Sequence, residues 1–312
     1  MRPQPPRPTL LIVGCGDVGM RVLRLVAARW RVLALTTSAA RCAELRAAGA
    51  VPLVGNLDVP VTLARLAGLA DAVLHLAPPP GTPSEGAGDP RTRHLLQALA
   101  RGGRVRRIVY ASTSGVYGDC GGARFDETRA RKPGTARARR RVDAEAQLRS
   151  FGRRSGVCVS ILRVPGIYAA DRPGGHPRER LLRGTPVLVP GADVHTNHIH
   201  ADDLARACVA ALQRGAPQRV YHASDDTVLT MGEYFDLAAD LCVLPRPPRI
   251  SRAQAAEQMS PLQLSFMSES RQLLNDRLKR ELRVALRYPT VADGLKCPEA
   301  GAASSPGPPP AR

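Results

Sequence analysis

Residues 10–19 of this chain read LLIVGCGDVG, and this stretch decides the fold. Its first four residues form an apolar run of the kind that a buried parallel strand needs. Three glycines follow in the spacing G-x-G-x-x-G, and the sequence after them has helical periodicity. A strand, a glycine-rich turn and a helix in this order predict a binding site for a dinucleotide. The alternative is a tight turn that binds no ligand.

Each glycine in the turn has its own physical role. Gly14 permits the tight turn, Gly16 lets the backbone approach a pyrophosphate, and Gly19 lets the helix pack closely on the strand. The amides at the start of the helix face the phosphates, and the helix dipole favours negative charge there. We therefore expect cofactor contacts along the whole turn, from Gly14, Cys15, Gly16, Asp17, Val18 and Gly19.

Six further apolar segments have the length and composition of strands, namely 31–35, 51–54, 72–76, 107–111, 158–163 and 220–223. Sequence with helical character lies between several of them, including a predicted helix over 90–100. Strands that alternate with helices predict an α/β fold with a Rossmann-type doubly wound parallel sheet. In such a sheet the ligand lies at the carboxyl ends of the strands.

The domain organisation follows from where this alternation stops. From Pro165 the pattern becomes irregular, as expected for a small C-terminal substrate lobe outside the sheet. Near the end of the chain Pro, Gly, Ala and Ser dominate, which is typical of a disordered tail. We expect a flexible N-terminus over 1–8, an NAD(P)-binding domain over 9–168 with return segments near 195–224, a lobe mainly over 169–295, and a tail over 296–312.

The end of the second predicted strand indicates which dinucleotide binds. A site that prefers NAD usually places Asp or Glu here to bind the ribose 2′-hydroxyl. This chain instead has hydroxyl side chains and an arginine, and no acidic residue before Glu44. These groups suit the 2′-phosphate of NADP, so we expect NADP rather than NAD, with contacts from Thr36, Thr37, Ser38 and Arg41. Ser38 could also cap the next helix.

The composition narrows the classes of partner. The net charge is +18, but only three of the 45 basic residues are lysines, and the arginines are scattered along the chain. Aromatic residues make up only 4%, so we expect no binding to a specific nucleic acid, even at the dense basic run 129–141.

No apolar run approaches the length of a membrane span, and no signal-peptide core precedes the first strand. Seven cysteines without Cys-x-x-Cys spacing suit a reducing cytoplasm.

Several motifs after the glycine-rich turn occur in a characteristic order. They are STSGVYG at 112–118, Asp126-Glu127 before Pro133, Ala144-Glu145, NHIHADDLA at 197–205, and RLKREL at 277–282. With these motifs the chain resembles the extended or atypical short-chain dehydrogenases/reductases, which include nucleotide-sugar epimerases and dehydratases. The resemblance covers residues 9–295. It implies Thr113 as the catalytic hydroxyl, an adenine side at Asn56 and Leu57, and a nicotinamide side at Ala77, Pro78 and Pro165.

The chain departs from that family at the Tyr-x-x-x-Lys motif, whose positions fall on Arg137 and Arg141. No tyrosine lies between Tyr117 and Tyr168, so the segment that carries the Ala144-Glu145 pair has no phenol at the motif position. A guanidinium stays protonated and cannot relay a proton. Arg141 would instead suit phosphate or ribose contacts. We expect the proton to be moved by Tyr168, with Asp119 or a histidine of 195–200 as alternatives.

Three histidines and two aspartates within 195–203 also resemble a metal-ligand cluster. A helix cap from Asp202 or Asp203 to a helix over 204–212 explains the acidic pair more simply, so we expect no metal.

These observations predict an NAD(P)-dependent oxidoreductase or epimerase that acts on a small polar or sugar-like carbonyl or alcohol. Thr113 would bind the reacting oxygen. The alternative is a catalytically silent NADP-binding redox sensor or scaffold, which the missing Tyr-Lys pair favours. Nucleic-acid binding through 129–141 is a third and weaker hypothesis. The sequence leaves the substrate and the oligomeric state open.

Overall fold

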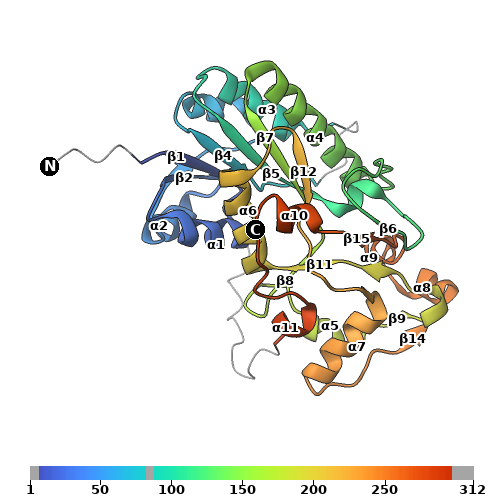
Figure 1. Ribbon diagram of the computed structural model, residues 1–312. Coiled ribbons are helices and arrows are strands. Elements are labelled where there is room, and N and C mark those ends of the chain that lie inside the picture. The colour runs from blue at the N-terminus through green and yellow to red at the C-terminus, as the bar shows by residue number, and fades with distance from the viewer. Residues whose placement is uncertain (1–6, 82–87, 297–312) are drawn as a thin grey trace.

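The computed structural model describes residues 7–81 and 88–296. Seven strands form one sheet in the order β12-β7-β5-β4-β1-β2-β3, and every neighbouring pair is parallel (Figure 1). The predicted doubly wound sheet of the Rossmann type is therefore confirmed. Its strands are β1 (Thr9–Val13), β2 (Arg31–Thr36), β3 (Ala50–Val54), β4 (Ala72–His75), β5 (Arg107–Thr113), β7 (Cys158–Val164) and β12 (Arg219–His222).

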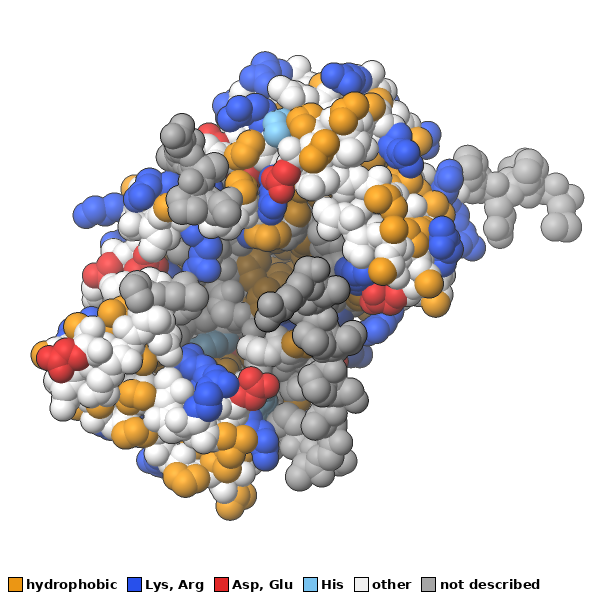
Figure 2. All heavy atoms as spheres, turned by 180° about the vertical axis from the view of Figure 1, so that it is seen from behind, with side chains coloured by type: hydrophobic (Ala, Val, Ile, Leu, Met, Phe, Trp, Pro, Cys, Tyr) orange, Lys and Arg blue, Asp and Glu red, His pale blue; other side chains and the backbone are white. Residues whose placement is uncertain are grey.

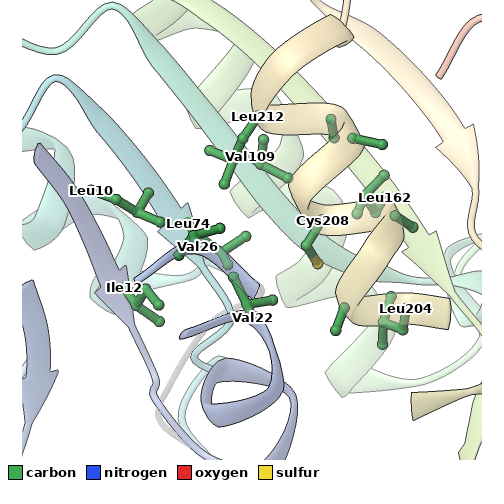
Figure 3. Close-up of a cluster of buried hydrophobic side chains, with 14 of the residues drawn as sticks. Leu10, Ile12, Val22, Val26, Leu74, Val109, Leu162, Leu204, Cys208 and Leu212 are labelled. Carbon is green, nitrogen blue, oxygen red and sulfur yellow. The ribbon is translucent and has the colours of Figure 1, made fainter. Parts of the chain in front are cut away.

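Helices cover both faces of the sheet because its strands are apolar on both sides. The helices of this domain are α1 (Asp17–Val26), α2 (Cys42–Ala47), α3 (Pro90–Ala100), α4 (Ala136–Ser155) and α6 (Ala201–Arg214). On one face Leu10 and Ile12 of β1 lie beside Val22 and Val26 of α1, and in the same core side chains of α6 lie beside Val109 and Leu162, as Figure 3 shows. On the other face Leu11 and Val13 pack with side chains of α3 and α4. Successive residues of β1 thus enter opposite cores.

The C-terminal lobe is built from short elements around a third core that includes Tyr168, Val187, Phe235 and Val291. Its helices are α5 (Arg178–Leu182), α7 (Met231–Leu241), α8 (Arg252–Gln258), α9 (Pro261–Phe266) and α11 (Val291–Gly294). Its paired strands are β8 (Gly166–Tyr168) with β11 (His198–His200), β9 (Val187–Leu188) with β14 (Arg249–Ile250), and β10 (His195–Thr196) with β13 (Leu229–Thr230).

The chain returns to the first domain after building the lobe. β15 (Gln272–Leu273) pairs with β6 (Arg124–Phe125), and α10 (Asp276–Arg280) packs against β12. Leu278 and Leu282 are fully buried in the same core as Leu10, although we expected this segment to belong to the substrate lobe. Most of the predicted flexible N-terminus and disordered tail, residues 1–6 and 297–312, lies outside the described residues.

Candidate functional site

A cavity of about 430 Å³ opens at the carboxyl ends of β1, β2, β3 and β4. Parallel strands meet with these ends at one edge, which is where ligands of such sheets bind. Ten of the predicted cofactor residues line it, namely Gly14, Cys15, Gly16, Thr36, Thr37, Arg41, Asn56, Leu57, Ala77 and Pro78. Five further lining residues were not predicted: Val13, Leu35, Gly55, Leu76 and Arg91.

The glycine-rich turn has the geometry that a dinucleotide requires. Gly14 has φ +88°, and a Cβ there would lie 2.6 Å from the backbone nitrogen of Ala77, so only glycine fits. A Cβ on Gly19 would lie 3.2 Å from the Gly14 carbonyl oxygen, which reflects the close helix packing. A Cβ on Gly16 would meet no atom within 4 Å. The backbone at Gly16 thus faces open space, and the turn fits a pyrophosphate group.

The end of β2 brings Arg41 to the cavity. Its Nη1 donates to the carbonyl oxygen of Cys15 at 2.8 Å, which ties it to the glycine-rich turn. Its Nε and Nη2 donate to the two carboxylate oxygens of Glu44 at 3.0 and 3.2 Å. Glu44 itself does not line the cavity. Ser38 does not line the cavity, and its side chain makes no capping hydrogen bond.

Arg91 is the charged lining residue that sequence reasoning missed. Its Nε and Nη2 donate to both carboxylate oxygens of Asp58 at 2.7 and 2.6 Å, and its Nη1 donates to the Pro78 carbonyl oxygen at 3.1 Å. It therefore connects the turns after β3 and β4. Its position in the first turn of the helix that follows β4 was the available signal, because that turn lies at the ligand-binding edge.

Asp17, Val18 and Gly19 begin α1 but do not line the cavity. Asp17 instead pairs with Arg21 at 3.2 Å and with Arg172 of the lobe at 2.7 Å. Arg21 also pairs with Asp171 at 2.6 Å and with Asp202 at 2.5 Å. This charge network connects the start of the dinucleotide-binding helix to two segments of the C-terminal half.

Thr113 ends β5 directly opposite Val164, the last residue of β7. Its Oγ1 accepts a hydrogen bond from the Gly115 amide at 3.2 Å, which orients the side chain. No described residue accepts its hydroxyl proton, so the half-buried hydroxyl can donate to a ligand. Pro165 follows β7, and neither residue lines the 430 Å³ cavity. The end of β5 lies next to that of β4, which Ala77 follows, and the end of β7 lies one strand further along the sheet.

Arg141 lies beneath this end of β5. Its Nη1 donates to the Tyr110 hydroxyl at 2.9 Å and to the Ala111 carbonyl oxygen at 2.7 Å. It does not line the cavity. The guanidinium is therefore held against the strand that ends in Thr113, and Arg137 is exposed one helical turn earlier.

Tyr168 does not have the surroundings that we expected of a proton donor. Its side chain is 2% exposed, and its hydroxyl donates to the Thr290 carbonyl oxygen at 3.1 Å. Burial and the nearby Asp225 carboxylate raise its pKa far above the usual range. The expected tuning by arginines is wrong, and Tyr168 is a core residue of the lobe.

The acidic pair after β11 does not cap α6. His200 is the N-cap residue, and its Nδ1 accepts from the Asp202 amide at 3.2 Å. Asp203 is fully buried and accepts from the amides of Arg287 and Tyr288, each at 2.9 Å. The predicted cap from Asp202 or Asp203 is therefore wrong, because a histidine nitrogen occupies that role.

The histidines of this segment have separate partners. His198 Nε2 lies 2.9 Å from the Thr196 hydroxyl oxygen, its ring stacks on Tyr234, and burial lowers its pKa to about 4. Burial also lowers the pKa of His200. Over residues 7–81 and 88–296, no group of three or more His, Cys, Asp or Glu side chains could hold a metal ion. The Nδ1 of His195 is buried and has no hydrogen-bond partner among these residues.

Asp119 was the other alternative proton donor. It accepts hydrogen bonds from the amides of Ser270 and Gly121 at 2.8 and 3.1 Å, and these lower its pKa. A carboxylate held ionised in this way does not suit a proton donor near neutral pH.

A buried polar network supports the strands behind Thr113. Glu145 of α4 is fully buried and accepts from Ser112 Oγ at 2.7 Å and from Arg163 Nε and Nη2 at 3.1 and 2.8 Å. Arg163 Nη1 also donates to the Tyr117 hydroxyl at 2.6 Å, and that oxygen lies 2.6 Å from His222 Nε2. The network connects β5, β7, α4 and β12.

The surface is basic without one dominant patch on the face seen in Figure 2. There the Lys and Arg side chains form separate groups over the upper and lower parts, and a hollow lies between the two parts. Within the described part of the chain, no helix combines the length and the apolarity that crossing a bilayer requires.

Residues 10–224 match the model of the NAD dependent epimerase/dehydratase family. The chain belongs to this family. The matched residues run from β1 to just beyond β12 and so include the whole parallel sheet. The resemblance to extended short-chain dehydrogenases/reductases is thereby confirmed.

Three proteins illustrate what the chain is similar to. Human dTDP-D-glucose 4,6-dehydratase is 26% identical over 137 residues, which are 41% of this chain and 38% of the human protein. A functionally unknown conserved protein from Silicibacter pomeroyi has a TM-score of 0.77 at 32% identity, covering 92% of this chain and 96% of that one. A dTDP-glucose 4,6-dehydratase double mutant from Streptomyces venezuelae, with NAD bound, has a TM-score of 0.72 at 23% identity, covering 92% and 95%.

Proposed function

We propose that this chain is an NADP(H)-dependent oxidoreductase or epimerase that acts on a small polar or sugar-like carbonyl or alcohol. The observation that carries the proposal is the cavity at the carboxyl ends of β1 to β4, with its glycine-rich turn. Membership of the epimerase/dehydratase family and the NAD bound to the Streptomyces relative support a nicotinamide dinucleotide. The sugar-nucleotide names of the relatives support a sugar-like substrate.

The cofactor would lie along the strand ends. Gly14 and Gly16 would hold the pyrophosphate, Thr36, Thr37 and Arg41 would contact the adenosine ribose and its 2′-phosphate, and Asn56 and Leu57 would contact the adenine. Ala77, Pro78 and Pro165 would line the nicotinamide side. When bound, the nicotinamide supplies a hydride donor or acceptor. Thr113 would donate its hydroxyl proton in a hydrogen bond to the reacting oxygen and so stabilise negative charge that develops there.

NADPH is expected to stabilise the protein more than NADH does at equal concentration. The end of β2 offers two threonine hydroxyls and a guanidinium to a 2′-phosphate. A ligand at about a hundred times its dissociation constant adds roughly 2.7 kcal/mol to the free energy of unfolding. The melting temperature measured with each nucleotide tests this directly. Equal shifts, or a larger shift with NADH, would contradict the assignment of the 2′-phosphate.

Thr113→Ala is expected to lower the rate of hydride transfer about 100-fold while leaving NADPH affinity within about twofold. The hydroxyl would serve the reacting oxygen and not the cofactor. The measurement is reduced-nicotinamide absorbance with the best substrate from a screen of carbonyl compounds and sugar nucleotides.

Thr113→Ser is the matched control, because it keeps both the hydroxyl and the hydrogen bond from the Gly115 amide. It should retain most of the activity. An active Thr113→Ala variant would exclude the proposed role. NADPH binding without turnover of any substrate would instead support the redox sensor, which the Arg137 and Arg141 positions favour.

A further inference from the structure

Arg41, which lines the cavity, forms a bidentate ion pair with Glu44. Arg41 ends the turn η1 (Ala39–Arg41), and Glu44 lies in the first turn of α2. The Nε–Nη2 edge of the guanidinium donates to both carboxylate oxygens, and Nη1 donates to the Cys15 carbonyl oxygen. The arginine is thus held by the glycine-rich turn on one side and by a carboxylate on the other.

The pair is accessible and charged. The side chains of Arg41 and Glu44 are 34% and 52% exposed, so water and solutes reach both groups. The hydrogen bonds from Arg41 lower the pKa of Glu44, which keeps it ionised at neutral pH. An exposed ion pair of this kind favours the paired state by a factor of about 5 or less. A stronger acceptor can therefore displace the carboxylate.

A phosphate group uses the same edge of a guanidinium that a carboxylate uses. The edge of Arg41 that Glu44 occupies belongs to a side chain that lines the cavity with Thr36 and Thr37. A 2′-phosphate placed there would compete with Glu44 for the hydrogen bonds from Nε and Nη2 of Arg41. It would also be repelled by the negative charge of the displaced carboxylate. At about 4 Å in water that repulsion is about fivefold per pair of unit charges.

We propose that Glu44 limits the affinity of this cavity for NADPH by occupying the edge of Arg41 that a 2′-phosphate requires. Glu44 weakens NADPH binding and leaves NADH binding nearly unchanged. The inference rests on the proposed dinucleotide function and deepens it, because it assigns the limit on NADPH affinity to one acidic side chain. Both carboxylate oxygens of Glu44 accept from Arg41.

The test compares the wild-type protein with Glu44→Gln, which removes the charge and keeps the shape. Dissociation constants are measured by titration calorimetry for NADPH, NADH, adenosine 2′,5′-bisphosphate and ADP. Glu44→Gln is expected to bind NADPH and the bisphosphate about 5- to 20-fold more tightly. Affinities for NADH and ADP should stay within about twofold. Glu179→Gln is the matched control, since Glu179 pairs with Arg183 on the short helix α5; it should change none of the four constants.

The possible failures are distinguishable. An unchanged NADPH to NADH ratio in Glu44→Gln overturns the role of Glu44 while the dinucleotide site stands. Weaker NADH binding with unchanged NADPH binding also overturns it, because Glu44 would then bind the ribose hydroxyl. If the wild-type protein binds none of the four probes, the proposed function fails and this inference fails with it.

Discussion

Replacing Glu145 by leucine is expected to lower the free energy of unfolding by about 3–5 kcal/mol, because it leaves a buried charge without its partner. Arg163 is 3% exposed, and two of its nitrogens donate to Glu145 at 3.1 and 2.8 Å. The Ser112 hydroxyl would lose its acceptor as well. The remaining bond from Arg163 to the Tyr117 hydroxyl cannot replace a carboxylate. Urea unfolding at neutral pH measures the loss.

A double variant shows how much of the lost stability comes from the unpaired charge of Arg163 and how much from the changed packing at Glu145. Glu145→Leu combined with Arg163→Met removes both ions, and it should recover at least half of the loss seen in Glu145→Leu alone. Glu179→Gln, which breaks an exposed pair of α5, should change stability by less than about 0.5 kcal/mol. A Glu145→Leu protein within about 1 kcal/mol of wild type would show that Arg163 finds another partner.

The second large effect is expected at Asp225, a 4% exposed carboxyl group whose pKa is raised to about 7 by burial. Its Oδ1 accepts from the Thr227 amide at 3.0 Å, and its Oδ2 has no partner among the described residues. Because the folded-state pKa lies above the unfolded value, the protonated form is stabilised. This contribution is complete below about pH 4 and is lost as the pH rises toward 7.

Asp225→Asn should therefore gain stability relative to wild type by about 2–3 kcal/mol between pH 5 and pH 8. The amide stays neutral across this range and keeps the acceptor for Thr227. The buried His75, His198 and His222 titrate in both proteins, so their effects cancel in the difference. Asp240→Asn is the control, because Arg246 lowers the pKa of this exposed group and it does not titrate there. A difference that does not change with pH would exclude the titration of Asp225.

The parts of the fold that depend on local sequence could be predicted. The first and last residues of every strand in the main sheet lie within two residues of those predicted from an apolar run. The runs are apolar because both faces of the sheet are covered by helices. The helix over 90–100 also agrees with expectation. Ten predicted cofactor residues meet in one cavity because each follows a strand of the same sheet.

The parts that depend on pairing between distant residues could not be predicted. Glu145 and Arg163 come from a helix and the next strand, and neither shows in the sequence that it is buried. Tyr168 follows a strand of the sheet, as a site residue would, but its partner Thr290 comes from the far end of the chain. Arg91 reaches the cavity because Asp58 and Pro78 hold it there.

The return of the chain after β15 has a consequence for its synthesis on the ribosome. All seven strands of the main sheet are made before Leu278 and Leu282, which complete the core that holds Leu10. When β12 has just emerged from the ribosome, the nascent chain therefore carries an apolar surface that α10 covers only later. Until then this surface is open to other chains and to chaperones, and the core of the first domain is completed only after the C-terminal segment has been made.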